Sequence, residues 1–563
     1  MKNVFISLFL MVAFAAQARQ YYLSPTGNDS NNGSSNSPFK TLNKVWTVVN
    51  AGDTVYLKGG TYQWNSAQYL SGKNGTANNL IKIWNYPGEL PILTNASSYS
   101  GNDLIEWTGN YIHWKGLEIA NFKGNTSFSA FRSENCNNCI FENINYHHNP
   151  MGFTIRNCNN NLVLNCDFHH NRDNAGDNAD GINITYITNT SYTNTVRGCR
   201  AWNNSDDGFD FWANNSAVTL ENSWAFYNGY ADGKNNPIGD GSGIKLGEGT
   251  GTRNINRCFS VHNSRWGLNE NNESGISNIY NNTFAYNGVV NLILGYWPNN
   301  SRGNLKNNIS HSPASNGDYL VLSKYTNTNN TWNSLVATNA DFVSTDETQL
   351  LRARKSDGSL PDITFMNLVS TSKLINAGVN VGLPYSGSAP DVGAIETGVS
   401  TPPPIPVNVP PVVNAGQDVT ITLPLNSVVL NGSATDPDGT ILSYQWKSGN
   451  TILGTSQSLT VSGLTAGTYT YQFSATDNNG ATTSDNVTVT VNAQPPIPPT
   501  PVYDTVYCDS IRYATPTSNG LTRKKVTYVV KKGDKWQDNT GTVLDLFFYY
   551  TRKEWFFMGR LYD

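Results

Sequence analysis

The chain is 563 residues long, which is enough for several domains, and 14% of its residues are charged. A formal net charge of −4 supplies no basic field for nucleic acid, so DNA and RNA are excluded as expected partners. The seven cysteines are an odd number and too sparse for a disulfide-stabilised scaffold of this length.

Residues 1–18 are predicted to be a signal peptide. Lys2 precedes an apolar run, VFISLFLMVAFAA, and the small-x-small sequence Ala16, Gln17, Ala18 that follows is the pattern that signal peptidase cleaves. No later stretch is apolar over the length that a membrane span needs. We therefore expect a secreted protein, extracellular or at the cell surface, that has no membrane span and begins at Arg19.

Residues 19–399 contain a repeat that predicts a parallel β-helix. Six recurring phrases, FENINYHHN, LNCDFHHN, GCRAWNN, ENSWAFYN, RCFSVHN and NNTFAYN, align the asparagines Asn149, Asn171, Asn204, Asn228, Asn263 and Asn287. Subtracting their numbers gives steps of 22, 33, 24, 35 and 24 residues. The short steps suit one coil each, and the long steps suit a coil with an inserted loop, at 172–203 and 229–262. Asparagines stacked at a turn in this way can hydrogen-bond along the helix axis.

The same repeat predicts which side chains share a face. A glycine-led strand follows each aligned asparagine, and the residue after the glycine is mostly large and apolar, so the next residue should point to solvent. That outward column reads Thr154, Asn183, Asp210, Lys245 and Asn269. Asp180 and Asp207 stand one position before their glycines, and Asp206 and Arg265 stand at the position before that. Because adjacent coils lie about 4.8 Å apart, we expect the four acids, the lysine and the arginine to meet on one face.

Four converging carboxylates without cysteine or histidine form a hard oxygen site, which favours Ca²⁺ over zinc or copper. A bound cation would relieve the repulsion within NNSDDGFDFW, residues 203–212. Any single one of these acids is also explained as a turn residue at a coil corner. The acids in register with Lys245 are better explained as a site.

Three segments resemble the active-site segments of polysaccharide lyase family 9, the calcium-dependent pectate lyases built on a right-handed parallel β-helix. They are ADGINI (179–184), NNSDDGFDFW (203–212) and GSGIKLGEG (241–249). The resemblance implies that Asp180, Asp206, Asp207 and Asp210 bind calcium and that Lys245 is the catalytic base. The expected reaction is β-elimination on a 4-linked uronate, in which a cation bound to the substrate carboxylate acidifies the C5 proton that Lys245 removes.

Arg265 falls one coil beyond Lys245, where it could clamp a second uronate carboxylate in a bidentate contact. This substrate-binding role comes from the register alone. A solvated surface arginine explains the residue equally well.

Proline-rich stretches at 400–411 and 493–502 are predicted to be extended linkers that separate two further parts of the chain. Residues 412–492 have short alternating runs between turns, as in an immunoglobulin-like β-sandwich. This part resembles the PKD family through DPDGTILSYQW (436–446) and YQFSATDNNG (471–480), which implies a spacer or a carbohydrate contact. Residues 503–563 match no family that we recognise and are expected to form a small β domain.

The predicted fold class is therefore all-β, and the predicted protein is a monomer that acts on an acidic plant cell-wall polysaccharide. Pectate is the first expected substrate, and a rhamnogalacturonan I lyase with the same site is an alternative. An inverting hydrolase that uses two of the aspartates would share the β-helix but leaves Lys245 without a role. A noncatalytic glycan-binding protein, in which the acids are surface residues, is the third possibility.

Overall fold

The computed structural model describes residues 18–99, 101–123, 129–173, 175–176, 178–230, 235–296, 302–313, 317–398, 410–436, 440–477 and 482–494, and the backbone of strands between 505 and 561. Nearly all of the predicted signal peptide and most of both predicted linkers lie outside these ranges. Within the described residues, no helix has the length and hydrophobicity needed to cross a membrane.

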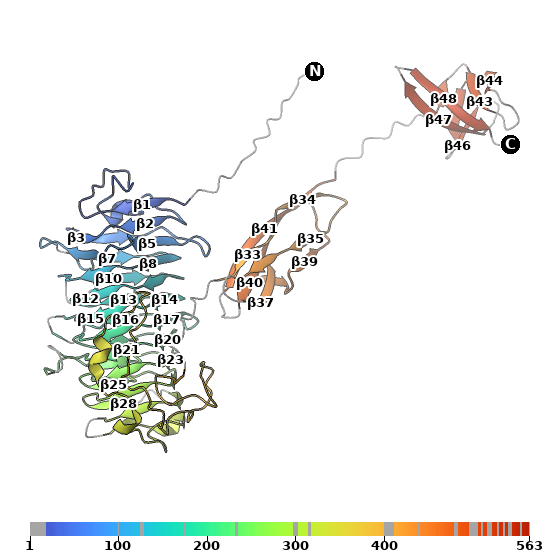
Figure 1. Ribbon diagram of the computed structural model, residues 1–563. Coiled ribbons are helices and arrows are strands. Elements are labelled where there is room, and N and C mark those ends of the chain that lie inside the picture. The colour runs from blue at the N-terminus through green and yellow to red at the C-terminus, as the bar shows by residue number, and fades with distance from the viewer. Residues whose placement is uncertain are drawn as a thin grey trace. The chain divides into compact units, whose positions relative to one another are not determined.

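Three parallel sheets form the predicted β-helix, and the chain visits them in the order I, III, II in each coil (Figure 1). Sheet I contains β1 (Gln20–Leu23), β2 (Thr54–Leu57), β5 (Ile81–Asn85), β8 (Ile112–Lys115), β11 (Ile140–Glu142), β14 (Asn161–Leu164), β17 (Thr193–Arg197), β20 (Ala217–Glu221), β23 (Arg253–Asn256), β26 (Ile276–Tyr280), β29 (Arg302–Lys306) and β32 (Tyr325–Thr328). Sheet II contains β4 (Gln68–Leu70), β7 (Ile105–Trp107), β10 (Phe131–Glu134), β13 (Phe153–Arg156), β16 (Ile182–Thr185), β19 (Phe209–Asp210), β22 (Ser242–Lys245), β25 (Trp266–Asn269), β28 (Val290–Leu294) and β31 (Tyr319–Leu320). Sheet III contains β3 (Gly60–Trp64), β6 (Pro91–Asn95), β9 (Glu118–Ala120), β12 (Asn145–His147), β15 (Asp167–His169), β18 (Arg200–Trp202), β21 (Trp224–Phe226), β24 (Phe259–Val261), β27 (Thr283–Ala285) and β30 (Ile309–His311). The helical segments of this part are short: α1 (Leu42–Trp46) and the 3₁₀ turns η1 (Leu322–Lys324), η2 (Asn339–Asp341) and η3 (Glu347–Leu351).

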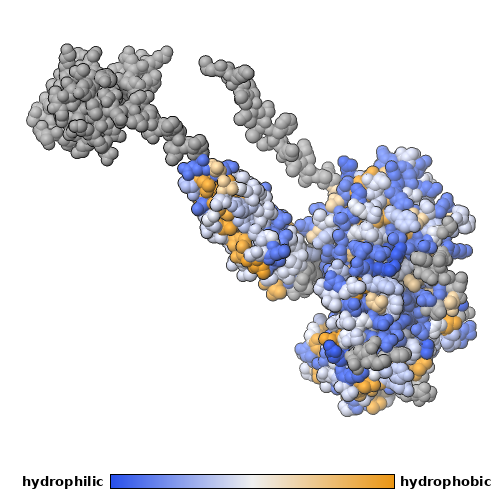
Figure 2. Space-filling model, turned by 180° about the vertical axis from the view of Figure 1, so that it is seen from behind, coloured by the Kyte–Doolittle hydropathy of each residue, from blue (hydrophilic) through white to orange (hydrophobic). Residues whose placement is uncertain are grey.

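The core fills the inside of the coils. The residues predicted to point inward after each glycine are fully buried, and they are Phe153, Ile182, Phe209, Ile244 and Leu268. The visible outer face of the β-helix is mainly hydrophilic, with scattered apolar residues (Figure 2). This alternation of apolar inward and polar outward residues is what holds each strand in its register.

The aligned asparagines form the predicted hydrogen-bonded stack, here called the asparagine ladder, at the turn between sheets III and II. The Nδ2 atoms of four successive members each donate to the Oδ1 atom of the next coil's asparagine at 2.9 Å, in the chain Asn171, Asn204, Asn228, Asn263 and Asn287. At the first step the backbone N–H of Asn149 donates to Asn171 Oδ1 at 3.2 Å. All six side chains are buried, so the ladder satisfies polar groups that would otherwise be costly to bury.

The glycines that lead the strands of sheet II pack directly on this ladder. A Cβ atom on Gly208 would lie 2.8 Å from Asn228 Nδ2 and 2.6 Å from the carbonyl oxygen of Gly243 in the next coil. A Cβ atom on Gly181 would meet Asn204 Nδ2 at 2.9 Å. Only glycine leaves room for both the ladder and the neighbouring strand, which explains why a glycine follows Asp180 and Asp207.

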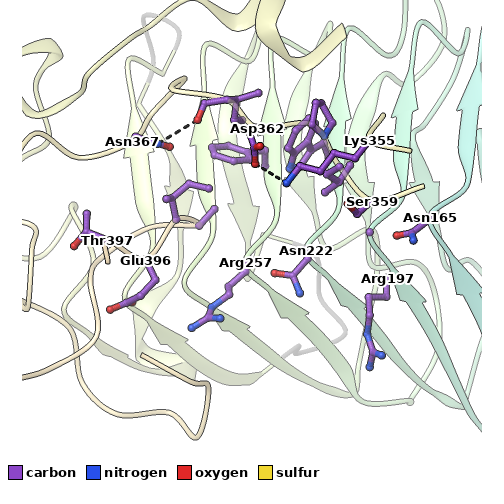
Figure 3. A pocket seen from close by; sticks show the side chains of 18 of the residues that line it. Asn165, Arg197, Asn222, Arg257, Lys355, Ser359, Asp362, Asn367, Glu396 and Thr397 are labelled. Carbon is purple, nitrogen blue, oxygen red and sulfur yellow. Dashed lines mark hydrogen bonds and ion pairs between the residues drawn. The ribbon is translucent and has the colours of Figure 1, made fainter. Parts of the chain in front are cut away.

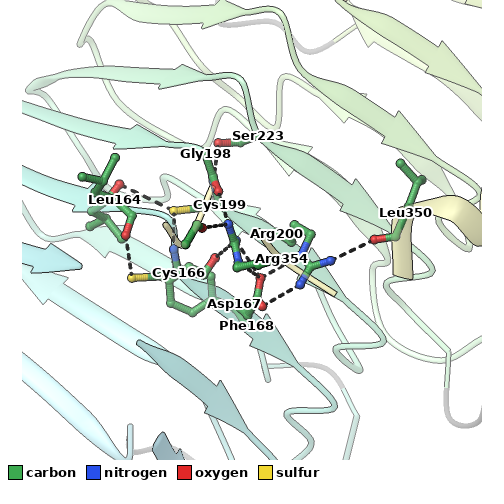
Figure 4. A network of polar contacts seen from close by, with 12 residues as sticks. Leu164, Cys166, Asp167, Phe168, Gly198, Cys199, Arg200, Ser223, Leu350 and Arg354 are labelled. Atoms are coloured by element: carbon green, nitrogen blue, oxygen red, sulfur yellow. Dashed lines mark hydrogen bonds and ion pairs between the residues drawn. The ribbon is translucent and has the colours of Figure 1, made fainter. Parts of the chain in front are cut away.

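The segment that follows the last coil packs on the outer face of sheet III. Phe342, Leu350, Phe365 and Leu368 join a buried apolar cluster with Phe259 and other residues of that sheet. Asp167 fastens the same segment, because its carboxylate binds both Arg200 and Arg354 at 2.7 Å (Figure 4). Burial alone would raise the pKa of Asp167, but the two guanidinium groups lower it to about 2.

The two parts that follow the β-helix are also β structures. The sandwich contains β33 (Val412–Asn414), β34 (Val419–Thr422), β35 (Val428–Asn431), β36 (Ser433–Thr435), β37 (Ile441–Ser448), β38 (Thr451–Gly454), β39 (Ser458–Val461), β40 (Gly467–Asp477) and β41 (Thr482–Asn492). Trp446 and Phe473 are its most buried aromatic residues. The last part has one seven-stranded sheet made of β42 (Thr505–Tyr507), β43 (Ser510–Ala514), β44 (Leu521–Lys525), β45 (Tyr528–Lys532), β46 (Lys535–Asp538), β47 (Val543–Thr551) and β48 (Glu554–Leu561).

Candidate active site

Sheet II carries the predicted column of outward residues. Asn183 pairs with Asp210 between β16 and β19, Asp210 pairs with Lys245 between β19 and β22, and Lys245 pairs with Asn269 between β22 and β25. The predicted register is therefore confirmed at each of these steps. It places the lysine one coil from Asp210, on the same face.

Lys245 is nearly buried and lies among carboxylates. Its Nζ atom is 2.8 Å from Asp207 Oδ2, 3.5 Å from Asp210 Oδ2 and 4.0 Å from Asp240 Oδ2. The side chains of Asp207 and Asp210 are buried, whereas that of Asp240 is 52% exposed. One cation is thus shared between two buried acids and one exposed acid.

Backbone hydrogen bonds hold the other two acids in the same region. Asp180 Oδ1 accepts from the backbone N–H of Asp207 at 3.2 Å, which links two successive coils. Asp206 Oδ1 accepts from the backbone N–H of Asp240 at 2.7 Å, so Asp206 holds the loop that precedes β22. The structure therefore brings all four predicted acids to this end of sheet II, with Asp206 turned towards the loop.

Burial and mutual repulsion disfavour the charged forms of these acids. Burial, together with Asp210 and Asp207, raises the pKa of Asp180 well above its ordinary value. Burial is also the main reason that the pKa of Asp206 rises to about 10 and that of Asp210 to about 6. Buried carboxylates this close together favour binding of a cation among them.

The same acids favour the charged form of Lys245. Burial alone would lower its pKa, but Asp207, Asp210 and Asp180 together raise it above its ordinary value. Without another cation, the lysine is therefore held in its charged form.

The acid cluster fits a calcium ion. One oxygen from each of Asp180, Asp207 and Asp210 can be chosen so that all three lie within 4.8 Å of one another. Since Ca²⁺ binds oxygen at about 2.3–2.6 Å, oxygens this close can share one ion. Asn183 donates its Nδ2 to Asp180 at 3.1 Å, and its own Oδ1 is buried and accepts no hydrogen bond from the described residues. The amide nitrogen of Asn183 faces Asp180 and Asp210, so the three carboxylates are the oxygen donors that fit calcium here.

A buried arginine fixes the chain directly after Lys245. Arg253 donates from Nε to the carbonyl oxygen of Leu246 at 2.9 Å and from Nη2 to that of Asn214 at 2.6 Å. It also forms an ion pair with Glu273 at 3.1 Å, and both side chains are fully buried. This support ties the end of β22 to neighbouring coils, so Lys245 has little freedom to move.

Arg265 lies at the edge of the site and is partly exposed. Its Nη1 atom is 3.3 Å from Asp240 Oδ1, and its guanidinium group stacks on the Trp266 ring at 4.1 Å from the ring centroid. Asp240 therefore bridges Arg265 and Lys245, a link that the sequence did not reveal. The acid sits in the inserted loop 229–262, whose path the repeat does not define.

A cavity of about 590 Å³ lies elsewhere, between the β-helix and the segment that covers sheet III (Figure 3). Asn222, Arg257, Trp224 and Phe259 line it from the β-helix, and Lys355 pairs with Asp362 at 2.6 Å on its other side. None of the predicted site residues lines this cavity. The acids and Lys245 instead face outward from sheet II.

Known proteins resemble the chain in two separate regions. The family model for the Pel9A-like right-handed beta helix region matches residues 21–308, and a family model for a PKD domain matches residues 415–491. "Pectate lyase L" of Dickeya dadantii is 35% identical over 409 residues, which is 67% of this chain and 90% of that protein. "Pectate lyase PEL9" of Emericella nidulans is 28% identical over 402 residues, 64% of this chain and 94% of that protein.

Two solved structures share the β-helix. The crystal structure of pectate lyase Pel9A aligns with a TM-score of 0.59 at 32% identity and covers 67% of this chain and 96% of that chain. A structure titled "Rhamnogalacturonan lyase" aligns with a TM-score of 0.56 at 29% identity and covers 63% and 97%. The matched family model, over residues 21–308, spans the part of the chain that holds the acids and Lys245.

Proposed function

The chain belongs to polysaccharide lyase family 9, the Pel9A-like right-handed β-helix family, with a PKD domain that follows in the sequence, and we propose that it cleaves 4-linked galacturonan (pectate) by calcium-dependent β-elimination. The observation that carries this proposal is the position of Lys245, which lies 2.8 Å from Asp207 within a buried acid cluster that fits a calcium ion.

In this proposal Asp180, Asp207 and Asp210 hold Ca²⁺, Asp206 completes the acid set, and the Asn183 amide nitrogen donates to Asp180 and Asp210. Bound Ca²⁺ would neutralise a uronate carboxylate and stabilise the negative charge that develops beside it. Such a charge is otherwise costly to form in a site that already contains several carboxylates.

Lys245 would act as the base. It removes the proton at C5 of the uronate, the electron pair forms the C4–C5 double bond, and the bond between C4 and the glycosidic oxygen breaks. The expelled oxygen takes up a proton from solvent. The products are a fragment with a new reducing end and a fragment with an unsaturated, non-reducing end.

Lysine can accept a proton only in its neutral form. The charges of Asp207 and Asp210 oppose that form unless another cation balances them. We therefore expect the strength of the base to depend on occupancy of the metal site, and the rate to rise towards alkaline pH.

The test is the ultraviolet absorbance of unsaturated products when the full chain acts on polygalacturonate. Activity should vanish with a chelator and return with Ca²⁺. Reducing ends that accumulate without any absorbance change would refute elimination and establish a hydrolase.

Rhamnogalacturonan I is the second candidate substrate, because a solved structure titled "Rhamnogalacturonan lyase" aligns over nearly its whole length. Elimination on this polymer can use the same acids and the same base. Parallel assays on polygalacturonate, methylated pectin and rhamnogalacturonan, each with and without Ca²⁺, distinguish the two substrates.

We also propose that the protein is secreted, as residues 1–18 indicate. Cleavage after Ala18 would be seen as a mature N-terminus at Arg19, read by mass spectrometry of protein from the culture medium.

A further inference from the structure

A second group of side chains lies on sheet II beside the metal and base column. By strand alternation, Arg156, Thr185 and Trp212 stand two residues beyond Thr154, Asn183 and Asp210, and so they face the same side. Arg156 pairs with Thr185 between β13 and β16, and Thr185 Oγ1 donates to the carbonyl oxygen of Trp212 at 2.7 Å. This second column therefore runs through the two coils that hold the four acids and through the coil before them.

Two exposed aromatic rings and a guanidinium group meet at this column, where Tyr186 follows Thr185 directly after the end of β16. Tyr186 and Trp212 are 49% and 36% exposed, and their ring centroids are 5.4 Å apart in an edge-to-face arrangement. The guanidinium group of Arg156 lies over the Tyr186 ring, 4.6 Å from its centroid. Exposed aromatic rings next to a guanidinium group offer an apolar surface and hydrogen-bond donors at one place, which is the combination that an acidic sugar needs.

Arg156 also lacks an acidic partner. Five other arginines of the β-helix are bound to carboxylates: Arg132, Arg197, Arg200, Arg253 and Arg265. No ion pair joins Arg156 to a carboxylate of the described residues, and its Nε atom is buried without a hydrogen-bond partner among them. The planar guanidinium group is thus free to bind a carboxylate from outside the chain.

The group is directly linked to the acid cluster. The backbone N–H of Trp212 donates to Asp210 Oδ1 at 2.8 Å, so the aromatic ring lies two residues from an acid of the candidate metal site. A polysaccharide that reaches Lys245 can therefore extend over this column.

We propose that Arg156, Tyr186 and Trp212 form a subsite for an acidic sugar unit next to the one that reacts. The inference rests on the proposed function and specifies its substrate contacts. Arg156 binds the uronate carboxylate in a bidentate contact, and the two rings pack against the apolar face of the sugar. The subsite would give the enzyme a preference for chains that carry a free carboxylate at that unit.

Steady-state kinetics of the full chain on polygalacturonate test the subsite. Arg156→Leu should raise KM about tenfold, with a smaller fall in kcat, because the contact is made both before and during the reaction. Arg156→Lys should recover part of the loss, because it restores the charge without the planar fork. Tyr186→Ala should also raise KM, whereas Tyr186→Phe keeps the ring and should behave as the parent does.

Arg302→Leu is the matched control, because Arg302 is an exposed arginine of β29 in sheet I. An unchanged KM in Arg156→Leu, whatever happens to its Tm, would show that the arginine only packs on Tyr186 and would overturn the inference. An equal rise of KM in Arg302→Leu would overturn it too, because the effect would then come from net charge.

Direct binding separates this inference from the proposed function. If the parent chain makes no unsaturated product, the proposed function fails, but calorimetry with an oligogalacturonate still reports on the subsite. Weaker binding in Arg156→Leu than in Arg302→Leu supports it. Absence of binding to the parent chain refutes it.

Discussion

Replacing Lys245 by methionine separates the electrostatic role of this residue from the catalytic role that we propose for it. The Nζ atom lies 2.8 Å from Asp207 and 3.5 Å from Asp210, and the side chain is 10% exposed. Removing one partner of a buried ion pair costs about 3–5 kcal/mol, because the other charge stays buried and uncompensated. The raised pKa of Asp210 lets that acid take up a proton and lessens the penalty. We therefore expect Lys245→Met to destabilise the metal-free protein by about 3 kcal/mol.

This loss should disappear when calcium is present. In a domain of more than about 200 residues, about 3 kcal/mol corresponds to a fall in Tm of roughly 6 °C, which scanning fluorimetry in a chelator would measure. A saturating calcium concentration should remove most of the difference, because another cation then balances the acids. The variant should also bind calcium more tightly than the parent, since the lysine no longer competes for Asp207 and Asp210.

Activity should fall whatever the metal concentration. Loss of a general base lowers rates by about 10²- to 10⁴-fold, and calcium cannot replace a proton acceptor. Lys245→Arg is the matched control, because arginine keeps the charge but does not deprotonate in this pH range. It should be nearly as stable as the parent and just as inactive as Lys245→Met. Parent-like activity in either variant would refute the assignment of the base, and equal destabilisation with and without calcium would refute the location of the metal.

Three further predictions concern the scaffold. The pKa of Asp167 is about 2 in the folded protein and about 3.9 in the unfolded chain. Its ion pairs should therefore contribute about 2–3 kcal/mol to the free energy of unfolding above pH 4, and this contribution should be lost as the pH falls through 2. Arg354→Met should weaken this contribution, and acid unfolding followed by circular dichroism measures the difference. Gly208→Ala should destabilise the β-helix by about 1–3 kcal/mol and lower its calcium affinity, because the added Cβ atom would meet Asn228 and Gly243. A Tm and a calcium affinity equal to those of the parent would contradict this packing argument. Asn228→Leu should cost about 2–4 kcal/mol by urea unfolding, because it leaves buried ladder groups of two coils unpaired, and a cost near zero would show that the ladder is dispensable.

The repeat made the β-helix and much of the site predictable. Once the asparagines were aligned, alternation along each strand placed Asp210 beside Lys245, and the pairing of β19 with β22 confirms this. Regular strands allow such inference because each residue has a defined neighbour one coil away. The calcium and base roles of these residues stay predictions until they are measured.

The contacts that the repeat could not reveal come from loops and from side-chain direction. Asp240 lies in an insertion, so no count of coils could place it 4.0 Å from Lys245. Arg253 and Glu273 are fully buried charged residues, and their ion pair together with the backbone groups that each binds explains their burial. The sequence did not single out Arg156, because the feature that distinguishes it is visible only in the structure: its Nε atom has no hydrogen-bond partner among the described residues.

The asparagine ladder has a consequence for how enzymes of this kind can diversify. The step from Asn171 to Asn204 spans 33 residues and the step from Asn204 to Asn228 spans 24, yet both amide contacts measure 2.9 Å. The ladder therefore holds coils at one spacing whatever the length of chain between them. Loops that border the acids can therefore be lengthened, shortened or replaced while the distance from Asp210 to Lys245 is preserved. Selection can thus change the surface around the acids without changing the contacts between Asp207, Asp210 and Lys245.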